Sequence, residues 1–206
     1  MALKTKQIEN ASPVEPRPFE RAEVQTSNSI SDDRQIPALA RNAVETYIFK
    51  RRVVELPHSS RTSLLNQSSA CFVSIKTLDR ELRGCIGTVE PEQSTLAEEI
   101  IANAIKAATR DPRFQPLSHV ELPSLRYSVD VLESPEPAQS EDLDPAIFGV
   151  VVLDYSGARR GLLLPNIESI ETADQQVRIA AKKAGIKPDE PIRLYRFRTR
   201  RFSEWA

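Results

Sequence analysis

Helix and strand patterns alternate irregularly along this chain, and their order constrains the fold more than any other feature. The strand patterns occur mostly as hairpins, and no regular strand-helix-strand repeat connects them. Helical patterns cover residues 36–54, 95–111 and 172–185, and strand patterns cover residues 70–89 and 148–164 as hairpins and residues 125–131 and 192–202 as single strands. This order predicts an α+β fold in which antiparallel or mixed sheets, built from hairpins, pack with helices.

Local signals mark the ends of the second and third helical patterns. Thr95 with Glu98, and Thr172 with Gln175, have the spacing of N-terminal capping boxes. The third pattern ends in two lysines followed by Gly185, as expected at a helix C-terminus. The positions of these two helices are therefore predicted from residues inside each segment.

The composition describes one ordinary globular domain and excludes several function classes. The 206 residues include 28 Lys+Arg and 29 Asp+Glu, so the net charge of -1 argues against a surface built to hold nucleic acid or anionic membranes. Two cysteines and two histidines, without metal-ligand spacing, predict neither a disulfide scaffold nor a zinc site. Phosphate-loop, dinucleotide and hydrolase-elbow motifs are absent from the sequence, and we expect no metal and no cofactor.

The first residues differ in composition from the remainder. Residues 1–34 combine three prolines with alternating charged residues and no sustained period, which predicts a flexible N-terminal arm before a domain over residues 35–206. The sequence contains neither a secretory signal nor an apolar run of membrane-spanning length. We therefore expect a cytoplasmic protein that does not associate with membranes.

The segment from Leu82 to Gly87, LRGCIG, has the most unusual composition for a strand. Gly84 and Gly87 bracket Cys85, and glycine in a strand indicates a bulge or the close approach of a backbone or a ligand. Period-two geometry puts Arg83 and Cys85 on one face, with Cα atoms roughly 7 Å apart. A neighbouring guanidinium favours a thiolate, so this reasoning predicts a nucleophilic or redox-active cysteine. The alternative is that Cys85 is a small apolar residue that fills the interior.

This segment, together with ATRDPRF at residues 108–114 and RGLLLP at residues 160–165, resembles the AMMECR1 family. The resemblance covers about residues 36–206. It implies an α+β protein of two unequal lobes with the LRGCIG segment at a cleft. It also implies relatives associated with Memo-like and radical-SAM proteins as partners, and it brings no established reaction.

The carry-over from the family adds a second segment to the candidate site. It reaches Arg110, Asp111, Arg113 and Phe114, where the arginines would grip an anionic group and Asp111 would orient one guanidinium. Because these residues follow a helix C-terminus, arginine is also favoured there without any function.

Three departures from the family pattern remove an obvious general base. Relatives commonly have histidine at the position of Phe148 and cysteine at that of Ala181, and they carry Gly-Trp-Asp near residues 169–172. His58 and His119 stand alone in the sequence, and a solitary histidine is more often structural than catalytic.

The last strand pattern is the most basic part of the chain. It carries Arg193, Arg196, Arg198, Arg200 and Arg201 without an acidic residue among them. The simplest interpretation is a solvated edge that is protected by charge. Tyr195 and Phe197 could stack on bases, which keeps nucleic-acid binding as the third hypothesis.

The leading functional hypothesis places a small anionic substrate around Cys85. Cys85 would be the thiolate nucleophile, Arg83 and Arg110 would hold the anion, and the backbone at Gly84 and Gly87 would approach it. The competing hypothesis is a non-catalytic interaction or regulatory module, and enzyme status stays open between the two. A homodimer is expected only from base rates.

Overall fold

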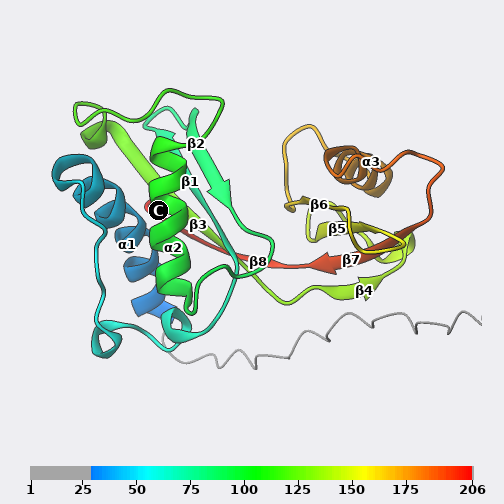
Figure 1. The fold of residues 1–206 in the computed structure, drawn as a ribbon, viewed down its shortest axis with the longest axis horizontal. Coiled ribbons are helices and arrows are strands. Elements are labelled where there is room, and N and C mark those ends of the chain that lie inside the picture. Colours follow the sequence, from blue (N-terminus) through cyan, green and yellow to red (C-terminus); the bar gives the residue numbers. More distant parts are fainter. Residues whose placement is uncertain (1–28, 206) are drawn as a thin grey trace, which may run out of the picture.

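Two four-stranded antiparallel sheets form two lobes in the computed structural model, which describes residues 29–205 (Figure 1). The described residues thus confirm the predicted α+β class. Residues 1–28 of the predicted arm lie outside the described part, whereas residues 29–34 belong to the first helix. None of the helices in residues 29–205 is long and apolar enough to cross a membrane.

The first lobe contains one sheet with strand order β2-β1-β3-β8 and two helices. Its elements are α1 (Ser29–Lys50), β1 (Cys71–Thr77), β2 (Leu82–Gly87), α2 (Leu96–Thr109), β3 (Leu125–Leu132) and β8 (Thr199–Ser203). Both helices pack on the same face of this sheet, where Val73, Ile75 and Tyr127 are fully buried with them. No helix of the described residues covers the opposite face of this sheet, which carries Ser74 and Cys85.

The second lobe contains the other sheet, with strand order β4-β7-β5-β6, and one helix. Its elements are β4 (Glu136–Ala138), β5 (Gly149–Asp154), β6 (Arg160–Leu163), α3 (Ala173–Lys183) and β7 (Ile192–Phe197). Short 3-10 turns complete the chain at His58–Ser60, Leu64–Asn66, Leu122–Ser124 and Ser140–Asp142. Helix α3 packs on β5 and β6, so each lobe has one helix-covered sheet face.

The helices predicted from the sequence are present, with one shift in boundary. Thr95 and Thr172 accept hydrogen bonds from the backbone of Glu98 and Gln175, as the capping signals predicted. Helix α1, predicted over residues 36–54, instead spans Ser29–Lys50 with Pro37 inside it. It ends where Arg51 adopts a left-handed backbone with φ 52°, a conformation typical of helix ends.

The strands differ from the prediction in two places. Between residues 132 and 148, where the sequence predicted neither a helix nor a strand, the structure contains β4, which pairs with β7 through Glu136, Pro137 and Ala138. The strand predicted over residues 192–202 is two strands, because β7 pairs in the second sheet and β8 in the first. The chain therefore passes between the lobes twice, from β3 to β4 and from β7 to β8 (Figure 1).

A small apolar core joins the lobes. Leu132 of β3 and Phe72 of β1 pack there with Val151, Leu162 and Phe197 from the second sheet. We call this cluster the interlobe core. Because Phe72 shares the face of Ser74, the interlobe core adjoins the helix-free face that carries Cys85.

Candidate functional site

Strand β2, which carries the LRGCIG segment, lies at the edge of the first sheet. Gly84 faces α2, where a Cβ would overlap the carbonyl oxygen of Ala107. At Gly87 a Cβ would overlap the ring of Phe72. The close approach predicted from these glycines is therefore explained by packing inside the first lobe, by a helix backbone at Gly84 and by a side chain at Gly87.

A β-bulge in this strand separates Arg83 from the Cys85 thiol. Ile75 pairs with Gly84 but Lys76 pairs with Leu82, so Arg83 is the extra residue. Its guanidinium donates to Glu121 Oε1 at 2.8 Å and to the carbonyl oxygen of Gln115 at 3.0 Å. The period-two prediction that Arg83 lies beside the thiol is wrong, because the bulge interrupts that period.

The Cys85 side chain points to the helix-free face of the first sheet, in register with three serines. Cys85 lies opposite Ser74, Ser74 lies opposite Ser128, and Ser128 lies opposite Ser203. We call these four residues the polar row. The Ser74 hydroxyl donates a hydrogen bond to Cys85 Sγ at 3.2 Å. The thiol is thus partly exposed and hydrogen-bonded, unlike Cys71, which is fully buried against the helices.

Asp111 and Arg113 cap the outer edge of β2 at Cys85. The Cys85 backbone N–H donates to Asp111 Oδ2 at 2.8 Å, and Arg113 Nη2 donates to the Cys85 carbonyl oxygen at 3.3 Å. Arg113 also binds Asp111 through Nε at 2.9 Å and Nη2 at 2.7 Å. We call this pair the edge clamp, because it satisfies the two backbone groups that a neighbouring strand would otherwise bind.

The edge clamp lowers the pKa of its carboxylate, whereas burial raises the pKa of the neighbouring thiol. The hydrogen bond from Arg113 lowers the pKa of Asp111 to about 2. Burial raises the pKa of Cys85 above its ordinary value, while the hydrogen bond from Ser74 and the charge of Arg113 oppose this shift without reversing it. Burial therefore works against the predicted thiolate, and the nucleophilic role of Cys85 stays a prediction.

A second arginine-carboxylate pair lies on the same sheet face. Arg201 binds Asp130 through Nε at 2.8 Å and Nη2 at 3.0 Å. The carboxylate of Asp130 is 3% exposed and the side chain of Arg201 is 58% exposed, which matches 2% and 53% in the edge clamp. The charge of Asp130 acts on the Cys85 thiol, and the thiol acts on Arg201. The sequence placed these residues only in an alternating strand and a basic strand, and it did not predict that they pair.

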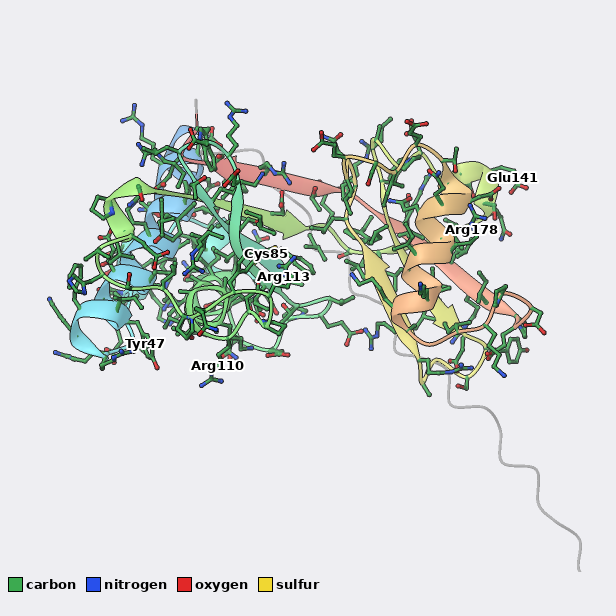
Figure 2. The ribbon with its side chains drawn as sticks, turned by 90° about the horizontal axis from the view of Figure 1, so that it is seen from above. Tyr47, Cys85, Arg110, Arg113, Glu141 and Arg178 are labelled. Carbon is green, nitrogen blue, oxygen red and sulfur yellow. The ribbon has the colours of Figure 1, made fainter. Side chains whose placement is uncertain are left out.

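The structure separates the remaining candidates from Cys85. Figure 2 shows Arg113 next to Cys85 and Arg110 apart from both; Arg110 lines a groove with Tyr47. His119 packs near the ring of Phe49, with ring centroids 6.3 Å apart, and His58 contacts Asn66. No histidine of residues 29–205 contacts the thiol, so the described part holds no Cys-His dyad.

A buried carboxylate that the sequence analysis missed fixes the chain where it leaves β2. Glu99 of α2 is 1% exposed and accepts hydrogen bonds from Thr88 Oγ1 at 2.6 Å and from the backbone N–H groups of Glu92 and Gln93, both at 2.8 Å. Asn103 supplies a further donor at 3.1 Å. All of these bonds are internal, so Glu99 supports the site without facing a ligand.

Several arginine and aromatic side chains of the basic segment 192–202 make contacts within the protein. Arg196 binds Glu136, Arg201 binds Asp130, and both Arg196 and Arg198 lie 4.5 Å from the ring centroid of Phe148. Tyr195 and Phe197 pack in the interlobe core and are not available to stack on bases. Phe148 and Ala181, where the resemblance led us to expect histidine and cysteine, both lie in the second lobe. Among the described residues, no cluster of His, Cys, Asp and Glu has the arrangement of a metal site.

Comparisons with known proteins agree with the sequence motifs. A family model described as AMMECR1 matches residues 37–202. A protein of Thermotoga maritima is 44% identical over 161 residues, which cover 77% of this chain and 91% of that protein. A Clostridium acetobutylicum protein is 40% identical over 167 residues, and the match spans 35% of its length. The crystal structure of an uncharacterised Pyrococcus horikoshii protein superposes with a TM-score of 0.74 at 29% identity, over 83% of this chain and 90% of that one.

Proposed function

This chain belongs to the AMMECR1 family, and we propose that it binds a small anionic molecule on the helix-free face of the first sheet, beside the Cys85 thiol. The observation that carries this proposal is the pair of half-exposed arginines, Arg113 and Arg201, each held by a buried carboxylate. A guanidinium fixed in this way has little rotamer freedom left to lose when it binds an anion.

Each of the two arginines keeps hydrogen-bond donors that no group among the described residues uses. Asp111 and Asp130 occupy Nε and Nη2 of their arginines, so Nη1 of each guanidinium remains for a carboxylate or phosphate oxygen. In the polar row, the hydroxyls of Ser128 and Ser203 add neutral donors on the same sheet face. We infer that the ligand is an anion with oxygens at both ends, such as a dicarboxylate or a phosphate ester, because each end can then meet one guanidinium.

In this proposal Cys85 takes part first as a hydrogen-bonding group. Burial raises the pKa of its thiol, which favours the protonated form. Attack on an electrophilic ligand requires that the thiol first lose its proton to solvent, and the charge of Asp130 on the same sheet face opposes this ionisation. Arg83, Gly84 and Gly87 position the strand in this scheme.

The test is anion binding with matched arginine variants. Inorganic phosphate, succinate and citrate are titrated while alkylation of Cys85 by iodoacetamide is followed. We expect at least one anion to slow alkylation, and Arg201→Gln to remove this protection. Arg200→Gln is the control, because Arg200 packs over Phe202 on the helix-covered face.

Unfolding curves of each variant separate loss of binding from loss of fold. The proposal is wrong if none of the anions protects Cys85, or if Arg200→Gln loses protection as strongly as Arg201→Gln.

One observation favours a second candidate, a protein-interaction module. Phe49 and Val120 are 63% and 71% exposed, and Phe49 packs near the ring of His119, which directly precedes Val120 in the sequence. Exposed apolar residues that gather in this way are typical of partner surfaces. The resemblance suggests Memo-like and radical-SAM proteins as the first partners to test, and Phe49→Ser would weaken such binding without changing the reactivity of Cys85.

A further inference from the structure

A groove on the outer side of α2 forms a second candidate binding site. It lies between the end of α1, the segment 53–57 and α2, and it encloses about 760 Å³. Since the helices cover one face of the first sheet and Cys85 lies on the other, this groove is separate from the site proposed above. Its volume is within the range of small-molecule sites, which is on the order of 300–1,000 Å³.

The walls of this groove are mostly apolar. Val54, Leu56, Ile101 and Ile105 line it, and each of them also packs in the core of the first lobe. The groove follows α2 from Glu98 to Arg110, a rise of about 18 Å. An occupant should therefore be elongated and apolar over most of its length.

Two of the cations in the groove are already satisfied by the protein. Arg61, with a side chain only 6% exposed, donates to the Leu56 carbonyl oxygen at 2.8 Å and to Thr95 Oγ1 at 3.2 Å, and it lies 3.7 Å from Glu98. Lys106 pairs with Glu92 at 2.9 Å. Neither group needs a ligand to balance its charge.

Arg110 differs from these two cations. Its backbone N–H bonds to the Lys106 carbonyl oxygen at the end of α2, but its side chain has no ion pair or hydrogen bond among the described residues. Glu55, the other charged residue at the groove without such a partner, also borders an adjacent cavity together with Lys50 and Arg52. One guanidinium at the end of an apolar groove is thus the group available for an anion.

We propose that this groove binds a small-molecule monocarboxylate with an elongated apolar body, whose carboxylate pairs with Arg110. The apolar walls would bury the body, and the guanidinium would supply two parallel hydrogen bonds to the carboxylate. A single negative charge fits best, because Glu55 and Glu98 would repel a second one.

The test compares octanoate with octanol, which has the same chain length and no charge, by calorimetry on the full chain. We expect octanoate to bind about tenfold more tightly than octanol, and Arg110→Gln to reduce octanoate to the affinity of octanol. The matched control is Arg178→Gln, on the exposed side of α3 in the second lobe, which should change neither affinity (Figure 2).

A second variant tests the groove itself. Ala102→Phe places a ring in the groove from a half-exposed position on α2, so both ligands should bind more weakly while the free energy of unfolding stays near that of the native chain. Equal binding of octanoate and octanol, absence of binding, or an affinity that Arg110→Gln leaves unchanged would each overturn the proposal. Cys85 alkylation should not respond to octanoate, so failure here is distinguishable from failure of the first site.

Discussion

Each lobe has a glycine on an edge strand that lies directly under a helix, and the two edges differ in the hydrogen bonds that their backbones make. In each lobe the edge strand of a hairpin carries an Arg-Gly pair, and a helix backbone lies directly on the glycine. Gly84 of β2 lies under the carbonyl oxygen of Ala107, and Gly161 of β6 lies under that of Ala180. At β2 the edge clamp binds both backbone groups of Cys85, whereas the backbone of β6 accepts one side-chain hydrogen bond among the described residues, from Lys183.

This difference shows which residues of the β2 edge are explained by packing and which indicate a binding site. Glycine under a helix occurs in both lobes, including the lobe where the residue after it is Leu162, so glycine at position 84 is explained by packing alone. The arginines held by buried carboxylates around a partly exposed thiol occur in the first lobe. The pairs Asp111–Arg113 and Asp130–Arg201 therefore mark the candidate site better than the glycines do.

Replacing either of the glycines that lie under a helix should destabilise the protein strongly. Gly84→Ala and Gly161→Ala each place a Cβ on a helix carbonyl oxygen, so the helix must move away from its sheet. We expect each variant to lower the free energy of unfolding by about 3 kcal/mol, measured by urea denaturation. Similar losses in both lobes would show that the two glycines have the same packing role, and a loss in only one lobe would show that their roles differ.

The control for this prediction is Gly185→Ala. Gly185 has φ 68°, but a Cβ there meets nothing within 4 Å, so its cost comes from the backbone conformation alone. That cost should be about 1 kcal/mol. If Gly185→Ala were as costly as Gly84→Ala, helix contact would not be the reason for glycine at position 84.

The next effect tests the edge clamp, which distinguishes the first lobe. Asp111→Ala leaves the Cys85 N–H without its acceptor and Arg113 without its partner, and it should cost about 2 kcal/mol at pH 7. Because the pKa of Asp111 is lowered to about 2, its charged form stabilises the fold fully above the ordinary value of about 3.9. This contribution disappears as the pH falls from about 4 toward 2.

Urea denaturation at several pH values measures how the contribution of Asp111 to stability depends on pH. The difference in stability between the native chain and Asp111→Asn should be constant from pH 5 to 7 and should shrink on acidification below about pH 4. A difference that stays constant down to pH 2 would show that the ion pair with Arg113 is not what Asp111 contributes.

A third prediction concerns the thiol next to the edge clamp. Because burial raises the pKa of Cys85, its alkylation at pH 7 should be several-fold slower than that of a free thiol, and the rate should still rise above pH of about 8.5. Cys71 is fully buried, so alkylation of the folded chain reports Cys85. A rate that levels off below pH 8 would mean an activated thiolate and would return Cys85 to the role of nucleophile.

The elements that the sequence predicted best are those whose signals are local. Thr172 and Gln175 lie three residues apart and cap α3 as predicted, and the hairpin from Ala70 to Val89 needs only its own alternation and a turn. Strand β4 was missed because three residues with a proline carry little strand signal. The division of the last strand at Arg198 was missed because it depends on pairing with two sheets.

The candidate site was only partly predictable for the same reason. The motifs identified Cys85, Asp111 and Arg113, which the structure brings together. Arg83 was misplaced because one bulge changes which side chains share a face, and hydrophobic periodicity does not reveal a bulge. Arg201 meets Asp130 across 71 residues of sequence, through a strand pairing that no local pattern specifies.

The ion pairs made by the arginines of the two Arg-Gly pairs should contribute little to stability, and to different extents. Arg83 binds Glu121 within its own lobe, with side chains 19% and 32% exposed, whereas Arg160 reaches Glu90 across the lobes, with side chains 36% and 49% exposed. Double-mutant cycles with glutamine at these positions should give a coupling energy of about 0.8 kcal/mol for Arg83–Glu121 and about 0.3 kcal/mol for Arg160–Glu90, since exposure weakens an ion pair. A larger coupling for Arg160–Glu90 would mean that the loop after β2 fixes the lobes relative to one another, and that the two edges are joined through Glu90.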